Sequence, residues 1–368
     1  MSLLKSRFIE MFGDVINNKK TWPTKRWSDV LNIVNGKNQK KVECENGIYP
    51  ICGSGGEIGK TNEYLTKENS VIIGRKGNIN NPILMKTKFW NVDTAFGLEP
   101  NNKEINVEYL YKFCELFDFQ RLNKTVTIPS LTKSDLLKIE IPVPPMKLQE
   151  EYRNFLAQVD KSKFLLQQIL EKFELLKKSR FIEMFIEKRY PTASLDELSI
   201  CGGEYGAQSS AIEYHPNRPR YVRITDINED GSLNNDYASS ANIKDDEQYR
   251  LKYGDFLFAR MGATVGKTYA YTFGDQIYAG YLIRYRLNLE KILPEYLFAF
   301  TRLNCYWKWV SINQNGAAQP GINAKKYGSL YVPVPPIEEQ KKFIELSQQI
   351  DKSKLIIQNA LEDLVGKV

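Results

Sequence analysis

Apolar residues recur at alternating spacings of three and four in two long stretches of the chain, which predicts two coiled-coil helices. The first predicted helix covers residues 147–185, and at about 1.5 Å per residue it would be about 58 Å long. Few globular domains hold a helix of that length, which disfavours the alternative of two amphipathic helices on unrelated cores. Its seam positions are Leu148, Tyr152, Phe155, Val159, Ser162, Leu166, Ile169, Phe173 and Leu176.

The second helix begins near residue 336 and repeats the pattern, with a serine in the seam at the same place. A Pro-Pro pair precedes each helix, and because proline disfavours helix in the residue before it, the pair sets where the helix begins. The seam positions of the second helix are Phe343, Leu346, Ile350, Ser353, Ile357, Ala360 and Leu364.

Identical segments show that the chain is an internal repeat. Residues 5–12, KSRFIEMF, recur at 178–185, and residues 160–163, DKSK, recur at 351–354. The first residues of the chain therefore match the end of the central helix. The C-terminal helix matches the earlier part of the central helix and stops at the point where the N-terminal copy begins. We expect residues 3–12 to lie beside residues 364–368 and to form with them a split copy of helix 147–185, in a cyclic order of helix, globule, helix, globule.

Between the helices lie two regions of mixed α/β (α+β) character. Short apolar runs at 71–73, 256–258 and 281–283 predict strands, and residues 106–119 and 293–310 predict short helices. The predicted fold is two globular domains joined by a pair of long antiparallel coiled-coil helices with pseudo-two-fold symmetry. Its segments are 1–19 (a helix that completes the C-terminal one), 20–145 (first globule), 146–187 (central helix), 188–335 (second globule) and 336–368 (C-terminal helix).

Composition narrows the classes of function. A length of 368 residues is too great for one ordinary domain, and the net charge of +7 suits a polyanionic partner. The five cysteines form no CxxC pair and His215 is the single histidine, so we expect no metal site. With neither a membrane-length apolar run nor a signal peptide in sight, the expected location is the cytoplasm.

Basic and amide residues at predicted strand ends and in polar loops are the candidate DNA contacts. Arg75 and Arg260 each follow an apolar strand, where a guanidinium can bind a guanine edge or a phosphate, unless each is a solvated turn residue. Loops 123–132 and 314–323 correspond in the repeat, and their amides could contact adenine or could be plain turn residues. The full candidate set is Lys60, Arg75, Lys76, Lys124, Thr125, Arg223, Arg260, Lys267, Gln314, Asn315 and Gln319.

No motif in the sequence predicts catalysis. The segments at 54–61 and 261–268 end in GKT but lack the first glycine of a phosphate-binding loop, since Ser54 and Met261 occupy that position. The Pro-Pro pairs lack the context of an amino-methyltransferase tetrapeptide, and one histidine disfavours most catalytic triads.

The chain has two dissimilar globules, and each is followed by a Pro-Pro segment (PVPPMKLQEE or PVPPIEEQKK) and a long helix. Together with the repeated KSRFIEMF segment, this order makes the chain resemble a DNA specificity subunit of a type I restriction–modification system. The resemblance covers nearly the whole chain. It departs from the family in opening with a segment that matches the end of the central helix.

The resemblance implies that each globule is a target recognition domain for one half of a bipartite site in double-stranded DNA. It implies that the helices set the spacer and dock two methyltransferase subunits, joined by restriction–translocase subunits. The chain itself would be non-catalytic and hold no cofactor, with S-adenosylmethionine, ATP and Mg²⁺ in the partners, which carry DNA adenine methyltransferase and endonuclease activity. The docking and spacer positions would be Tyr152, Phe155, Val159, Leu166, Phe173, Phe343, Leu346, Ile350, Ile357 and Leu364.

Two other functions stay open at this point: a nucleic-acid-binding scaffold without methyltransferase partners, and an enzyme with an unrecognised site in the globules. Under the main interpretation, removal of residues 1–12 should harm partner docking at one of two equivalent sites more than DNA recognition.

Overall fold

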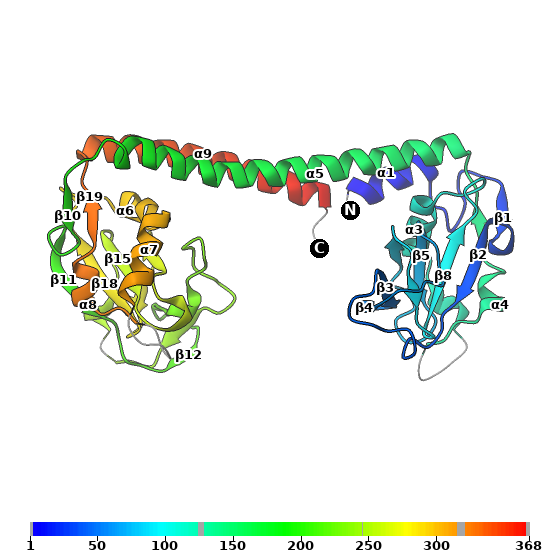
Figure 1. The fold of residues 1–368 in the computed structure, drawn as a ribbon, viewed down its shortest axis with the longest axis horizontal. Helices are drawn as coiled ribbons and strands as arrows, with labels where there is room; N and C mark the ends of the chain where they lie inside the picture. The colour runs from blue at the N-terminus through cyan, green and yellow to red at the C-terminus, as the bar shows by residue number, and fades with distance from the viewer. Residues whose placement is uncertain (1–2, 124–128, 245, 315–320, 366–368) are drawn as a thin grey trace. The chain divides into compact units, whose positions relative to one another are not determined.

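The computed structural model describes residues 3–123, 129–244, 246–314 and 321–365 (Figure 1). The chain divides into unit 1, residues 1–167 with 358–368, and unit 2, residues 168–357. Each unit combines one globule of strands and short helices with segments of the long helices. The predicted mixed α/β class with two globules and long helices is therefore confirmed.

Unit 1 is built on a four-stranded antiparallel sheet of order β2-β8-β5-β6, beside a three-stranded sheet of order β4-β3-β7. Its strands are β1 (Thr24–Arg26), β2 (Leu31–Asn35), β3 (Tyr49–Gly53), β4 (Gly56–Thr61), β5 (Ser70–Gly74), β6 (Ile83–Met85), β7 (Trp90–Asn91), β8 (Ala95–Pro100) and β9 (Glu140–Pro142). Its short helices are α1 (Leu3–Phe12), α2 (Trp27–Val30), α3 (Val107–Leu116), η1 (Phe119–Leu122) and α4 (Lys133–Leu136).

Unit 2 repeats this plan with a four-stranded sheet of order β11-β18-β15-β16. Its strands are β10 (Thr192–Ser194), β11 (Ser199–Tyr205), β12 (Ala211–Glu213), β13 (Arg220–Val222), β14 (Ser239–Ala241), β15 (Asp255–Ala259), β16 (Thr268–Ala270), β17 (Gln276–Tyr278), β18 (Leu282–Leu287) and β19 (Tyr331–Pro333). Its short helices are η3 (Ile224–Asp226), η4 (Glu247–Tyr249), η5 (Gly262–Thr264), α6 (Pro294–Phe300), α7 (Asn304–Asn313) and α8 (Ala324–Gly328).

The two globules share their topology although their sequences differ. In both, the central strand of the main sheet (β5 or β15) is fully buried, and the first and last strands (β1 with β9, β10 with β19) pair antiparallel. A short parallel pair also recurs, as β3 with β7 and as β13 with β17. Unit 2 adds the β12–β14 pair. The predicted helix over 293–310 is two helices, α6 and α7, separated by residues 301–303.

The long helices are α5 (Met146–Phe181), which continues into a π-helical turn, η2 (Ile182–Ile186), and α9 (Ile337–Val365). Within unit 2 they are antiparallel neighbours, since the Lys177 ammonium lies 2.9 Å from Asp351 and Lys354 pairs with Glu174. The seam of α5 differs in part from the heptad prediction. Ser162, Ile169 and Leu176 are exposed, whereas Lys163, Leu170 and Lys177 are half-buried. Lysine can take a seam position because its stem packs while its ammonium reaches a carboxylate.

Helix α1 belongs to the core of unit 1. Phe8 and Phe12 are fully buried, and their rings lie 5.3 and 5.5 Å from that of Tyr152 at the start of α5. The ring of Tyr109 completes this cluster, 5.6 Å from Phe8 and 4.9 Å from Phe12.

The same cluster recurs in unit 2, where Phe181 and Phe185 replace the α1 phenylalanines. Their rings lie 5.2 and 5.7 Å from Phe343 and 5.0 Å each from Tyr296. Residues 358–365 of α9 belong to unit 1, and Figure 1 shows this end of α9 and α1 following one another along α5. That the two segments form one split helix stays a prediction, because part of the predicted junction, residues 366–368, lies outside the described part of the chain.

Candidate nucleic-acid interface

An arginine at the end of the central strand occupies the same backbone frame in both globules. Arg75 follows β5 and Arg260 follows β15, and each carbonyl accepts a 2.9 Å hydrogen bond, from the amides of Leu131 and Ile322 respectively. The Arg-x-Gly repeat in the sequence suggests that the two arginines correspond. Their matching backbone hydrogen bonds, from the amides of Leu131 and Ile322, show that the two positions are equivalent.

The two guanidiniums also point into equivalent surroundings. Arg75 donates from Nη1 to the Asp93 carbonyl at 3.5 Å, and Arg260 donates from Nε to the Gly280 carbonyl at 3.2 Å. Arg75 lies over the Phe96 ring, with its Cζ 5.7 Å from the centroid. The cation–π contacts and the hydrogen bonds to carbonyls hold both cations at one end of the main sheet. Each arginine side chain is only half-buried, so both cations remain accessible from the surface.

A pocket of about 520 Å³ opens beside Arg260. Two of its other cations, Lys325 and Lys326, come from α8, whose first turn is capped by the Asn323 side chain. No carboxylate lines the pocket among the described residues, so its three positive charges favour an anionic ligand. The lining residues are Arg260, Met261, Asn313, Gly321, Ile322, Asn323, Lys325, Lys326 and Ser329.

The remaining predicted contacts fall into three groups. Lys60, Lys76 and Gln314 are exposed and free to meet a ligand. Lys124, Thr125, Asn315 and Gln319 lie outside the described residues.

Arg223 and Lys267, both predicted DNA contacts, are half-buried and paired with carboxylates of the second globule. Arg223 donates to the buried carboxylate of Asp226 at 2.8 Å and also to the Tyr237 carbonyl. The Lys267 ammonium lies 2.7 Å from Glu229. Sequence could not reveal these ion pairs, because the positions of the carboxylate partners are set by loop conformation.

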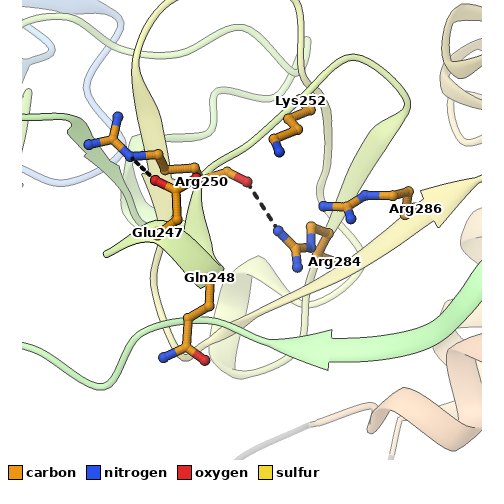
Figure 2. A pocket seen from close by; sticks show the side chains of 6 residues that line it. All are labelled: Glu247, Gln248, Arg250, Lys252, Arg284 and Arg286. Carbon is orange, nitrogen blue, oxygen red and sulfur yellow. Dashed lines mark hydrogen bonds and ion pairs between the residues drawn. The ribbon is translucent and has the colours of Figure 1, made fainter. Parts of the chain in front are cut away.

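A second group of basic side chains, which the sequence did not single out, gathers at the opposite end of β15 (Figure 2). Arg286 donates to the fully buried Asp255 at 2.9 Å, and this bond raises the pKa of the Arg286 guanidinium. Arg284 pairs with Glu204 at 2.5 Å, and Arg250 pairs with Asp275. Because each guanidinium already has a carboxylate, this cluster is a structural ion-pair network and a poor site for an added anion.

We expect Asp255→Asn to destabilise unit 2 by about 3–5 kcal/mol, because it leaves the guanidiniums of Arg286 and Arg284 without their buried counter-charge. Urea unfolding followed by circular dichroism measures the loss. The matched control is Asp275→Asn, at an exposed pair, where we expect about 0–1 kcal/mol. Equal, small effects of the two substitutions would show that Asp255 does not organise the cluster.

A buried glutamine joins each globule to its long helix. The Gln149 Oε1 atom accepts from the Asn106 amide at 2.9 Å, and Nε2 donates to the carbonyls of Glu104 and Pro144 at 3.1 and 2.8 Å. Its side chain is fully buried, and the bonds to the Asn106 amide and the Pro144 carbonyl form away from water.

Gln340 makes the equivalent contacts in unit 2. It accepts from the Leu293 amide at 2.9 Å and donates to the carbonyls of Lys291 and Pro335 at 3.0 and 2.9 Å. In sequence only the Pro-x-Pro-Pro spacing to the glutamine was visible. The structure shows that this residue ties the first helical turn to a loop more than 40 residues away.

Neither segment that resembles a phosphate-binding loop precedes a helix N-terminus of useful length. Residues 56–61 form β4, and the second segment contains the single turn η5 followed by β16. In the described ranges there is no group of three or more histidine, cysteine, aspartate or glutamate residues arranged to hold a metal ion. Among the helices described, none has the length and apolar character needed to cross a membrane.

Comparison with known proteins gives one consistent result. The family model of the type I restriction modification DNA specificity domain matches twice, at residues 19–175 and 209–365. The chain is 23% identical to the type I restriction enzyme MjaVIII specificity subunit of Methanocaldococcus jannaschii, covering 99% of this chain and 96% of that protein. It is 22% identical to the EcoDI specificity subunit of Escherichia coli, covering 94% and 85%.

Solved structures agree on the fold. The HsdS subunit from Thermoanaerobacter tengcongensis superimposes with a TM-score of 0.51 at 16% identity, over 93% of each chain. A chain from a structure concerning complex assembly and conformational transition of the type I R-M system gives a TM-score of 0.61 at 16% identity, over 93% of this chain and 94% of that one.

Proposed function

The chain belongs to the type I restriction modification DNA specificity family, and from this premise we propose that each of its globules recognises one half of a bipartite DNA site. Its role is DNA-recognition specificity. We assign the half-sites to residues 20–145 and 188–335, and the spacer to the helices at 146–187 and 336–368 with 1–19.

The observation that carries this proposal is the duplicated arginine frame of Arg75 and Arg260. Two globules with one topology and different surface residues suit two different DNA sequences. The exposed candidates Lys60, Lys76 and Gln314, with Lys325 and Lys326 beside Arg260, supply charge for phosphates and polar groups for base edges.

The helices would set the distance between half-sites. A helix of the length of α5, 36 residues, is about 54 Å long, which corresponds to roughly 16 base pairs at about 3.4 Å each. The same helices would dock two methyltransferase subunits, and restriction–translocase subunits would join them. S-adenosylmethionine, ATP and Mg²⁺ would be held by those partners in the cytoplasm, and this chain would contribute no catalysis.

The proposal predicts a methylated motif with two different halves, and a spacer that follows helix length. Seven residues inserted after Leu170 of α5, with seven after Ile357 of α9, preserve the heptad phase and add about 10 Å. We expect both half-sequences to persist while the spacer grows by about three base pairs. Sequencing of modified bases in a host that carries the chain with its partners measures this.

A motif without two halves, or an unchanged spacer in a stable variant, would contradict the proposal. The competing function, a scaffold without methyltransferases, predicts a chain that purifies alone. Co-purification of two methyltransferase subunits per chain would exclude that alternative.

A further inference from the structure

Arg260 is held more rigidly than a surface arginine ordinarily is. Its amide donates to the Tyr281 carbonyl at 3.0 Å, and its carbonyl accepts from the Ile322 amide at 2.9 Å, so the backbone is tied on both sides. Its Nε donates to the Gly280 carbonyl at 3.2 Å. The guanidinium carbon lies 4.9 Å from the ring centroid of Tyr205 and 5.9 Å from that of Tyr281. Five contacts, two of the backbone and three of the side chain, thus restrain the position of the cation.

The two terminal nitrogens, Nη1 and Nη2, form no hydrogen bond or ion pair with any described residue. The neighbouring tyrosines are open to solvent, with Tyr205 44% and Tyr281 54% exposed. Other arginines of this globule differ, since Arg223 and Arg284 use their terminal nitrogens on carboxylates. Arg260 therefore presents a pre-oriented fork of two unused donors.

We propose that Arg260 recognises a guanine in the half-site of the second globule, donating from its two terminal nitrogens to O6 and N7 in the major groove. Tyr205 and Tyr281 are positioning residues that hold the guanidinium plane. This assignment rests on the proposed function. Guanine is the base whose major-groove edge offers two adjacent acceptors, which matches a fixed guanidinium fork.

A phosphate is the competing ligand for the same two donors. The pocket already contains Lys325 and Lys326, whose exposed ammonium groups can neutralise phosphates as point charges without a fixed plane. A phosphate can also accept from a guanidinium fork, but the lysines beside Arg260 already supply phosphate contacts, whereas a base edge needs the direction and spacing that a fixed fork provides. The geometry therefore favours base recognition for Arg260 and phosphate contact for the lysines.

This assignment is tested by letting the full-length chain select its binding sites from a randomised pool of duplex DNA. The bases that the first globule selects serve as the internal standard. The wild-type chain should require guanine at one position of the second half-site. Arg260→Ala should lower that preference at least tenfold and Arg260→Lys by a smaller factor, because an ammonium can still donate to O6 or N7 without the planar fork, and both should leave the first half-site unchanged. The matched control is Arg218→Ala, which removes one exposed positive charge from the same globule and should keep the guanine.

A second variant separates positioning from contact. Tyr281→Leu leaves the backbone carbonyl that holds Arg260 but removes one ring, so the guanine preference should fall by a smaller factor. If Arg260→Ala retains the guanine preference, or weakens binding to all sequences uniformly, Arg260 contacts a phosphate and the assignment is overturned. A wild-type chain that selects no split sequence would instead refute the bipartite function on which the assignment rests.

Discussion

Phe8→Ala should destabilise unit 1 by about 3–5 kcal/mol, the range for a large aromatic removed from a packed core. Phe8 is fully buried and contacts Phe12, Tyr109 and Tyr152 with ring centroids 4.8–5.6 Å apart. Truncation leaves a cavity at the junction of α1, α3 and α5, which the surrounding rings cannot fill. Hydrogen exchange measured by mass spectrometry should show faster exchange in unit 1 while unit 2 stays protected.

Phe181→Ala is the matched control, because Phe181 holds the same place in the second copy of the cluster. We expect a loss of similar size, now confined to unit 2. If Phe8→Ala leaves exchange in unit 1 unchanged while Phe181→Ala disrupts unit 2, then α1 does not replace the end of the central helix as the structure indicates.

Burial of α1 changes the expectation for a chain that lacks residues 1–12. The repeat alone suggested that partner docking would suffer more than DNA recognition. Phe8, Met11 and Phe12 instead form one continuous core with the strands of the first globule. Removal of α1 should therefore impair recognition of the first half-site as well as docking.

Gln149→Met should destabilise the junction between the first globule and α5 by about 3 kcal/mol or more. The substitution keeps the side-chain volume but leaves a buried amide, a buried carbonyl and the half-buried Glu104 carbonyl without their partner, at about 1–3 kcal/mol for each buried group. Because the glutamine ties α5 to the loop before α3, the globule should lose its fixed direction on the helix. We expect the methylated motif to tolerate more than one spacer length.

Hydrogen exchange at residues 104–110 and the spacer distribution of modified sites are the two measurements. Gln340→Met should reproduce the effect in unit 2, around Lys291 and Leu293. Glu150→Ala, at an exposed neighbour on the same helical turn, is the control and should change neither quantity. If Gln149→Met accelerates hydrogen exchange but the methylated motif keeps a single spacer length, then Gln149 stabilises the junction without setting the spacing, and that part of the prediction is wrong.

Much of the architecture follows from local patterns along the chain. The heptads predicted α5 and α9, and apolar runs predicted β5, β15 and β18, because helix and strand periodicities depend on neighbouring residues. The repeat of KSRFIEMF predicted that α1 would act as part of a long helix. The Arg-x-Gly pairs correctly placed Arg75 and Arg260 at strand ends.

Contacts between distant residues decided the rest. Lys267 and Arg260 look equally available in sequence, yet Glu229 neutralises the first while the terminal nitrogens of the second meet no described partner. The heptad could not place Lys177 on the seam, because a charged residue takes such a position only when its partner helix offers packing and a carboxylate.

The sequence by itself determined the repeat, the long helices, the strand ends and the family, since each depends on residue identity and spacing over short ranges. Tertiary structure decided which cations remain free for a ligand and which glutamines join the globules to the helices. The physical reason is that a buried polar group is defined by its partners, and for Gln149, Gln340 and Asp255 most of these lie tens of residues away.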